Sequence, residues 1–411
     1  MTAELYLDYQ STTPCDPAVV QAMLPWFTTE FGNPHSADHA MGRRAWDAVE
    51  VARAEVAALL GADAREVVFT SGATEANNIA IKGAVRHLAA RGDTRRRVVT
   101  VATEHKCVLE AVRDLAAEGF DPVILPVGPD GRLDPETLRA ALAVPTLLVS
   151  IMAANNETGV LHDLAALAPI VRAAGALLHS DMAQAAGKTA LDVRAMDVDL
   201  ASVSAHKLYG PKGVGALYVR RRPRVRLAPL FSGGGQERGV RSGTLPTPLL
   251  VGFGEACRIA RTDRVAEARR MGALRDGLLA RLQAAIPGIA VNGSMAHRLP
   301  ANLNLCLPDV RALDVIARAE GLCISTGSAC SSAELVPSYV LTAMGLDADA
   351  AARSLRLAVG RYTSAADMDR AAAILCRAVE DVRAAGRERA AQSADDGSTQ
   401  DDTARIAECR T

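Results

Sequence analysis

The sequence predicts an α/β fold in which a mainly parallel sheet lies between layers of helices. Between residues 66 and 219, short apolar runs alternate with stretches in which apolar residues recur every three or four positions. The short runs are typical of buried strands, and the longer stretches are typical of amphipathic helices. Strands that alternate with helices favour a parallel sheet covered on both faces.

Each element of this region has its own signal. Residues 43–60 repeat apolar side chains at helical spacing, and Gly61 is expected to end that helix. Asp134 and Pro135 supply an N-cap and a first-turn proline for another helix. The expected strands are residues 67–69, 98–101, 123–125, 147–151, 176–179 and 200–203.

The pattern changes after about residue 260, which indicates a second, smaller α+β domain. A charged helix is expected over residues 264–285, a strand over 303–307 and a Ser/Gly-rich loop over 325–333. We therefore expect a large domain over residues 14–260. Residues 1–13 with 261–385 would form the small domain, including a loop at 325–340. Residues 386–411 turn polar and are expected to be a disordered tail.

Composition excludes several classes of protein. A net charge of -1 argues against nucleic acid as an obligatory partner. There is no run of about 18 apolar residues, so no membrane span is expected. The first residues lack the pattern of a signal peptide, and the eight cysteines show neither metal-binding spacing nor a disulfide framework. We expect a cytoplasmic protein without a bound metal, in which a thiol can react.

Polar residues follow three of the expected strands. Ligands of parallel sheets bind at the carboxyl ends of the strands, so these residues are candidates for a site. Small residues and hydroxyls at 70–75 open a helix and could hold an anion, although an ordinary N-cap would look the same. Asp181 and Gln184 follow a second strand, and Ser204, His206 and Lys207 follow a third.

These three groups together match the needs of a pyridoxal cofactor. Such a cofactor requires a phosphate cup, an acid against its pyridinium nitrogen and a lysine for its aldehyde. A lone lysine is usually a solvated surface residue, but Lys207 follows a buried strand and Asp181 precedes it by one strand. The combination favours a Schiff-base lysine over a surface one.

Longer motifs make the chain similar to a known family. They are LDYQSTTPCDP at 7–17, FGNPHS at 31–36, FTSGATEANNIAIKG at 69–83, TEHK at 103–106, NNETG at 155–159, SAHKLYGPKGVGALYVRR at 204–221, GGGQERGVRSGT at 233–244, STGSACSSAELVPSYVL at 325–341 and LRLAVGRYT at 355–363. The chain resembles the IscS/NifS-type cysteine desulfurases, within the class V aminotransferase-like branch of fold-type I pyridoxal enzymes. The resemblance covers residue 5 to about 385 and implies a seven-stranded type of sheet in the large domain.

The resemblance also implies roles for individual residues. Lys207 would carry pyridoxal 5'-phosphate, with Asp181 at its ring nitrogen, Gln184 at its phenolic oxygen and His105 over the ring as a catalytic proton carrier. Asn156 and Arg356 would hold the substrate, Arg356 through a bidentate fork. The phosphate would be held by Ala73, Thr74, Ser204, His206 and, from the second subunit of a homodimer, Thr244.

Cys330 is the candidate sulfur acceptor. It lies among small polar residues, whereas Cys306 and Cys323 lie in apolar runs, Cys107 starts a helix expected to pack inward, and Cys409 lies in the tail. Sequence chemistry alone leaves these alternatives open, and the resemblance selects Cys330. The implied reaction converts L-cysteine to L-alanine and a Cys330 persulfide that supplies iron–sulfur cluster assembly and, as a further outlet, tRNA thiolation.

Alternatives and departures accompany this interpretation. Selenocysteine lyase, cysteine-sulfinate desulfinase and aminotransferase reactions use the same kind of site, and a catalytically idle sulfur-transfer scaffold is a rival of another class. Gln10, Ser11 and the pair at 153–154 depart from the commonest family spelling, and the polar tail leaves an IscU-type scaffold partner in doubt. Gly187-Lys188-Thr189 mimics the end of a P-loop, but Met182 replaces its first glycine.

Overall fold

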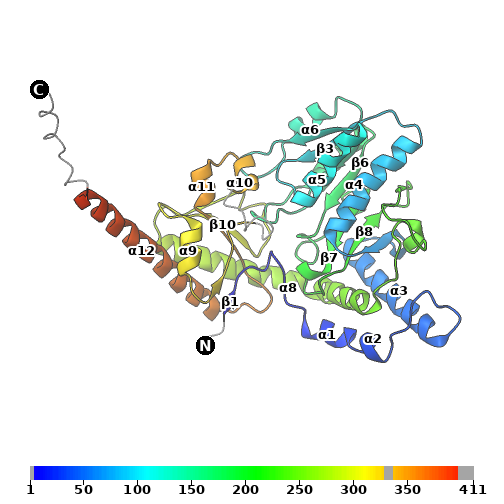
Figure 1. Ribbon diagram of the computed structural model, residues 1–411, viewed down its shortest axis with the longest axis horizontal. Helices are drawn as coiled ribbons and strands as arrows, with labels where there is room; N and C mark the ends of the chain where they lie inside the picture. Colours follow the sequence, from blue (N-terminus) through cyan, green and yellow to red (C-terminus); the bar gives the residue numbers. More distant parts are fainter. Residues whose placement is uncertain (1–3, 328–336, 397–411) are drawn as a thin grey trace, which may run out of the picture.

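The computed structural model describes residues 4–327 and 337–396. Its largest sheet has seven strands in the order β2-β8-β7-β6-β5-β3-β4 (Figure 1). Strand β8 pairs antiparallel with both of its neighbours, and the other adjacent pairs are parallel. The strands are β2 Val67–Thr70, β3 Arg97–Val101, β4 Asp121–Leu125, β5 Thr146–Ser150, β6 Leu177–Asp181, β7 Leu200–Ser204 and β8 Gly215–Val219. The predicted fold class is confirmed.

Helices cover both faces of this sheet because successive strand residues point to opposite sides. Val68 and Val98 pack in a core with α4 (Ala73–Ala90) and α5 (Lys106–Asp114). Phe69 and Val99 pack in a second core on the other face. That core includes residues of α1 (Pro17–Met23), α3 (Ala40–Leu60), α6 (Pro135–Ala141), α7 (Leu164–Ala173) and the first part of α8 (Thr247–Ala285).

A smaller part of the molecule lies beside the seven-stranded sheet (Figure 1). It contains an antiparallel sheet in the order β12-β10-β9 and a parallel pair of β1 with β11. The N-terminal strand therefore joins segments from the end of the chain. The elements are β1 Leu5–Tyr6, β9 Ala290–Val291, β10 Asn302–Cys306, β11 Leu322–Cys323, β12 Ser354–Ala358, α9 Ala312–Arg318, α10 Tyr339–Ala343, α11 Ala348–Ala352 and α12 Ala365–Asp396. The short helix α2 (Pro25–Thr28) follows α1 and contacts α8.

Helix α8 connects the two parts. The sequence predicts a helix over 264–285, whereas α8 is continuous over 39 residues and begins at Thr247. Its first half packs Leu250 and Phe253 in the core of the large part, and its second half packs Met271 and Leu278 in the core of the small part. The change near residue 260 is thus a change of packing partner within one helix. The division into two domains remains a proposal.

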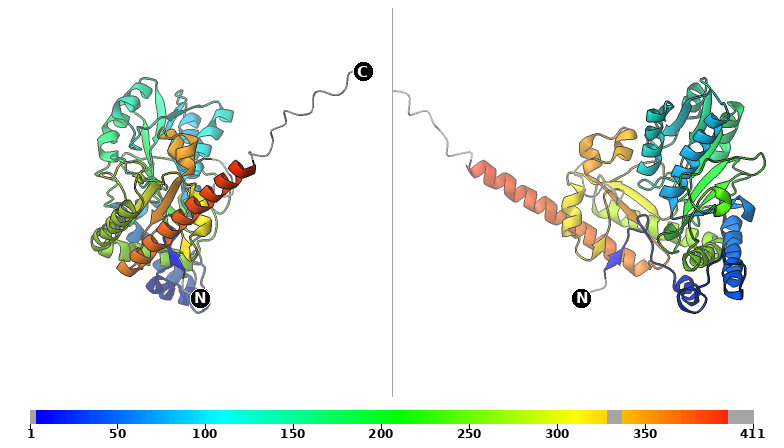
Figure 2. Two further views of the ribbon diagram at one scale, coloured as in Figure 1. Left: turned by 90° about the vertical axis from the view of Figure 1, so that its left-hand side faces the viewer. Right: turned by 45° about the vertical axis from the view of Figure 1, so that its right-hand side comes forward.

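The C-terminal segment differs from the expectation. Helix α12 continues to Asp396 and projects from the smaller part, whereas a disordered tail was expected over residues 386–411 (Figure 2). Residues 397–411 of that expected tail lie outside the described residues. The reason is local, because Ala, Arg and Glu dominate residues 384–391 and favour a helix even with little apolar surface to bury. Among the described residues, no helix is long and apolar enough to cross a bilayer.

Candidate active site

A cavity of about 530 Å³ opens at the carboxyl ends of β2, β6 and β7, a size typical of small-molecule sites. Nearly all the predicted site residues line it, namely Ala73, Thr74, His105, Asn156, Asp181, Gln184, Ser204, His206, Lys207 and Arg356. Thr244 is exposed and does not line the cavity of its own chain. Cys330 lies outside the described residues.

The N-terminus of α4 forms one wall of the cavity. Gly72 is its N-cap residue, with φ 150°, and no side chain caps the first turn. A Cβ added to Gly72 would meet nothing within 4 Å, so the approach to this turn is open. Glu75 also lines the cavity, and its carboxylate accepts hydrogen bonds from Ser71 N at 2.6 Å and Arg241 Nε at 3.0 Å. The backbone N–H groups of Ala73 and Thr74 thus offer a cradle for an anion.

Lys207 enters from a 3-10 turn (Ala205–Lys207) that directly follows β7. Its Nζ donates to the carbonyl oxygens of Gln10 at 2.7 Å and Ser11 at 2.8 Å. The same N-terminal segment is fixed to the lysine turn by Thr13, whose hydroxyl donates to His206 O at 3.0 Å. Two backbone carbonyl oxygens therefore orient the amine.

His206 precedes Lys207 in that turn and is uncharged at neutral pH. Burial, together with the charges of Lys207, Lys212 and Lys188, lowers the pKa of His206 to about 4. Its Nδ1 lies 3.0 Å from the hydroxyl of Thr12.

Asp181 stands at the carboxyl end of β6 and is held by two donors. Asn77 Nδ2 donates to its Oδ2 at 2.7 Å, and the backbone N of Ala183 donates to its Oδ1 at 2.9 Å. Asn77 is fully buried on α4 and is a residue that the sequence analysis missed. The two hydrogen bonds fix the orientation of a carboxylate that lines the cavity.

His105 is the N-cap of α5 and faces the same cavity. Its Nδ1 accepts from the backbone N of Cys107 at 3.2 Å, so in the neutral ring the proton belongs on Nε2. Burial lowers the pKa of His105; the Asp181 carboxylate opposes this effect, and Lys207 and Lys106 reinforce it. His105 therefore presents an N–H donor from Nε2.

Cys107 was expected to pack inward, but it also lines the cavity. Its Sγ lies 3.0 Å from His105 Nδ1 and accepts from Asn77 at 3.2 Å.

Arg356 and Asn156 supply polar atoms on the remaining side. Arg356 is buried, with Nη1 donating to Asn156 O at 2.9 Å and Nη2 to Asp8 Oδ1 at 2.6 Å. Within the described residues, Arg356 Nε and Asn156 Oδ1 are buried without a hydrogen-bond partner. Buried polar atoms are normally paired, so these two atoms point to a polar ligand.

The residues that sequence reasoning missed share one property. Asn77 and Gln10 both contact site residues from segments that are distant in the sequence, Asn77 through Asp181 and Gln10 through Gln184. Asn77 did carry a signal, since it is a polar residue between apolar positions on the buried face of a helix pattern.

The fold and this cavity define an α/β enzyme whose site combines an anion cradle, an acid at one strand end and a lysine at the next. The family described as aminotransferase class-V matches residues 5–371. The cysteine desulfurase IscS of Anaeromyxobacter sp. (strain Fw109-5) is 51% identical over 383 residues, which cover 93% of this chain and 94% of that protein. That of Rickettsia bellii (strain OSU 85-389) is 48% identical over 379 residues, or 92% of each chain.

A solved structure named a NifS-like protein superposes with a TM-score of 0.84 at 34% identity, covering 92% of this chain and 99% of that chain. The chain therefore belongs to the class-V aminotransferase family and, within it, to the IscS-type cysteine desulfurases.

Proposed function

We propose that this protein is a cysteine desulfurase that uses pyridoxal 5'-phosphate and transfers sulfur from L-cysteine to Cys330. The observation that carries the proposal is the convergence of the α4 N-terminus, Asp181 and Lys207 on one cavity, in a chain of this family. The sulfur serves iron–sulfur cluster assembly, and tRNA thiolation is a further outlet for it.

The donor set fits the cofactor. The first turn of α4 with Thr74, Ser204 and His206 would hold the phosphate, and Asp181 would pair with the ring nitrogen. Gln184 would contact the phenolic oxygen, His105 would lie over the ring, and Lys207 would bind the aldehyde. When bound, the cofactor supplies an electron sink that makes the Cα–H and C–S bonds of L-cysteine labile.

The protein's own groups hold the substrate and move its protons. Arg356 Nε and Asn156 Oδ1, the two buried atoms without a partner in the described part of the chain, would bind the carboxylate and amino end of L-cysteine. Lys207 Nζ would accept the proton from Cα, and His105 Nε2 would donate one within the cavity.

Sulfur transfer balances without an external oxidant or reductant. The Cys330 thiolate would attack the substrate sulfur, forming an S–S bond as the C–S bond breaks. The electron pair of the C–S bond stays on the substrate carbon, which takes up a proton. The products are L-alanine and a persulfide on Cys330.

The proposal includes assembly of the protein into a homodimer. Thr244 is exposed and does not line the cavity of its own chain, which is consistent with a contribution to the phosphate site of a second subunit. An IscU-type scaffold is a candidate acceptor protein, and a reducing cytosol would keep the acceptor thiol available.

Mass spectrometry of the protein after incubation with L-cysteine and without reductant tests the proposal. We expect about 32 Da on the Cys330 peptide, one added sulfur, together with alanine release without any keto acid. Cys330→Ser should keep the visible colour of the cofactor and lose both signals, with Cys306→Ser as the matched control. Turnover by Cys330→Ser would overturn the acceptor assignment, and alanine formation that requires a keto acid would favour an aminotransferase.

A further inference from the structure

The segment Gly187-Lys188-Thr189 has no part in the function described so far, yet the structure holds it in a defined place. It follows β6 in a tight turn in which Lys188 N and Thr189 N both donate to Ala185 O at 3.0 Å. Gly187 has φ 74°, and a Cβ there would lie 3.1 Å from the Cβ atoms of Ala260 and Leu208. The turn is thus packed closely against α8 and against the residue that follows Lys207.

Lys188 is hydrogen-bonded to a residue of the cofactor site. Its Nζ donates to Gln184 Oε1 at 2.8 Å, across one turn of the chain. Gln184 Nε2 in turn donates to Gln10 O at 2.8 Å. A charged lysine has only donors and a backbone carbonyl only accepts, so both contacts require the same orientation of the Gln184 amide. The second N–H of Nε2 then remains for the cavity that Gln184 lines.

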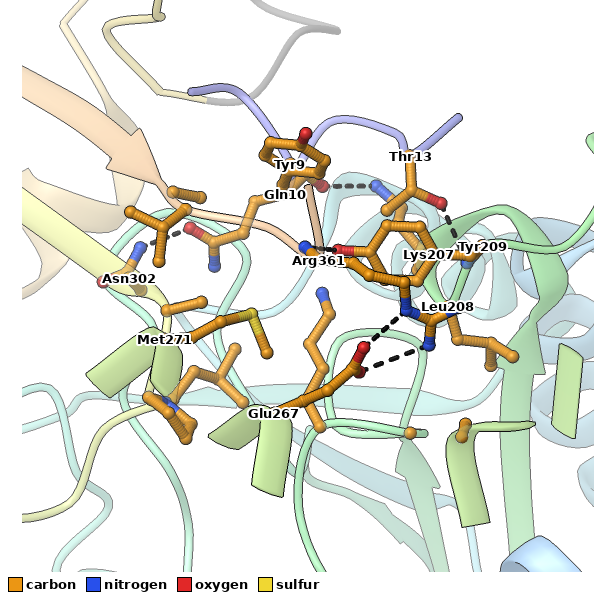
Figure 3. A pocket seen from close by; sticks show the side chains of 18 residues that line it. Tyr9, Gln10, Thr13, Lys207, Leu208, Tyr209, Glu267, Met271, Asn302 and Arg361 are labelled. Atoms are coloured by element: carbon orange, nitrogen blue, oxygen red, sulfur yellow. Dashed lines mark hydrogen bonds and ion pairs between the residues drawn. The ribbon is translucent and has the colours of Figure 1, made fainter. Parts of the chain in front are cut away.

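Lys188 does not reach the substrate itself. It lines a separate cavity of about 20 Å³, shown in Figure 3, whose wall includes Gln10, Lys207, Glu267 and Arg361. A volume of this size holds about one water molecule and excludes an amino acid. Lys188 is therefore placed to act on the reaction through Gln184.

The hydrogen bond from Lys188 does not depend on its charge. Desolvation, together with the neighbouring charges of Lys207 and Arg356, lowers the pKa of Lys188 to about 7. A neutral amine still carries N–H donors, so the contact with Gln184 persists on both sides of that pH.

We propose that Lys188 is a positioning residue that fixes the Gln184 amide so that its Nε2 N–H faces the phenolic oxygen of the cofactor. The inference rests on the proposed function, in which Gln184 contacts that oxygen. Without Lys188 the amide keeps Gln10 O as its partner but loses the donor that holds Oε1, so it would rotate more readily and present Oε1, which repels a phenolic oxygen instead of binding it. Gln184 would then lose its effect although it is still present.

A double-mutant cycle on the holoenzyme tests this role through the visible absorption of the cofactor. The variants are Lys188→Met, Gln184→Met and both together, and the measured quantity is the pH midpoint of the absorption change. The N–H stabilises the deprotonated phenolic oxygen, so its loss should raise the midpoint by roughly 0.7 unit, the fivefold effect of one typical hydrogen bond. Lys188→Met in the Gln184→Met background should add nothing.

Two further variants keep the test specific. Lys188→Arg retains a donor and should restore the wild-type midpoint. Thr189→Val is the matched control in the same turn, because the Thr189 hydroxyl bonds only Ala185 O at 3.3 Å among the described contacts, and it should leave the midpoint unchanged. If Lys188→Met fails to load cofactor, Lys188→Gln, which can accept as well as donate, should give an intermediate shift.

The outcomes separate this inference from the proposed function. A shift in Gln184→Met without one in Lys188→Met overturns the role of Lys188 and leaves the function intact. Additive shifts also overturn it, because Lys188 would then act by its charge and not through the amide. If the midpoint does not shift in Gln184→Met, Gln184 does not contact the phenolic oxygen. The premise of the inference then fails.

Discussion

Arg53 and Glu237 form a bidentate ion pair, with Nη1 to Oε2 at 2.7 Å and Nη2 to Oε1 at 2.8 Å. Both side chains are buried, at 3% and 2% exposure, and Glu237 Oε2 also accepts from Phe69 N at 2.7 Å. Arg53 belongs to α3, whereas Glu237 belongs to the segment that leads to Thr244. The pair therefore ties that segment to α3 and to β2.

Glu237→Ala should lower the free energy of unfolding by about 3–5 kcal/mol, because it leaves a buried guanidinium without its main partner. Urea unfolding measures the loss. Glu255→Ala, which breaks the more exposed pair with Arg258, should cost less than about 1 kcal/mol. Equal losses in the two variants would contradict this account.

Removing both charges at this position should be milder than removing one. The double variant Arg53→Met with Glu237→Leu leaves no unpaired buried charge, so it should recover much of the stability lost in Glu237→Ala. The same urea experiment compares them. A double variant less stable than Glu237→Ala would contradict this account and show that the other contacts of Arg53, with Glu50 and Val67 O, outweigh the cost of its unpaired charge.

Asn77→Leu should weaken retention of the cofactor roughly tenfold, because Asp181 loses one of its two donors and a hydrogen bond to a charged group is removed. Equilibrium dialysis followed by absorbance measures the affinity. Asn77→Asp should weaken it further by placing a second carboxylate against Asp181. Wild-type affinity in both variants would show that Asn77 has no part in holding Asp181.

Cys107 should be a slow nucleophile although it lines the active-site cavity. Burial raises its pKa to about 12, with the Asp181 charge adding to the effect against the hydrogen bonds from Asn77 and Thr74. At pH 7.5 alkylation of the folded protein by iodoacetamide should be roughly a thousandfold slower than for an ordinary thiol. Peptide mapping measures the rates in folded and urea-unfolded protein, and fast labelling in the folded state would refute the prediction.

Stability should fall as the pH falls from about 6.5 to about 4. Desolvation lowers the pKa of His162 to about 4, that of His179 to about 3 and that of His206 to about 4. In this window the unfolded chain binds more protons than the folded one, so acid favours unfolding. The stability from these histidines is complete above pH 6.5.

Each such group contributes a slope of up to about 1.4 kcal/mol per pH unit in that window. Urea unfolding at pH 7, 6 and 5 measures the slope, which His179→Gln should reduce. His35→Gln, at an exposed position, is the control and should leave the slope unchanged. An unchanged slope in His179→Gln would contradict the prediction.

The central sheet could be predicted from the sequence because each strand is marked by a short local run of apolar residues. The run at 98–101 predicts β3 to within one residue, since consecutive β-branched residues suit a strand buried on both faces. Gly61 was predicted to end α3 and does so in a left-handed conformation, with φ 70°. Helix α8 was not predicted at its full length, because its apolar stripe changes direction where it passes from one core to the other.

The site was predicted where its residues directly follow strands. Asp181 and Lys207 were found in this way, since strand ends of a parallel sheet meet at one edge. Asn77 and Lys188 were missed because their importance depends on which side chain they meet. Asn77 lies 104 residues from Asp181, and no local pattern encodes that meeting.

The ion pair between Asp8 and Arg356 joins residues that are 348 positions apart. During synthesis, the Lys207 turn leaves the ribosome before Arg356 has been made. Arg356 is the residue that fixes the N-terminal segment next to Lys207. A nascent chain therefore carries an incomplete pocket for most of its synthesis.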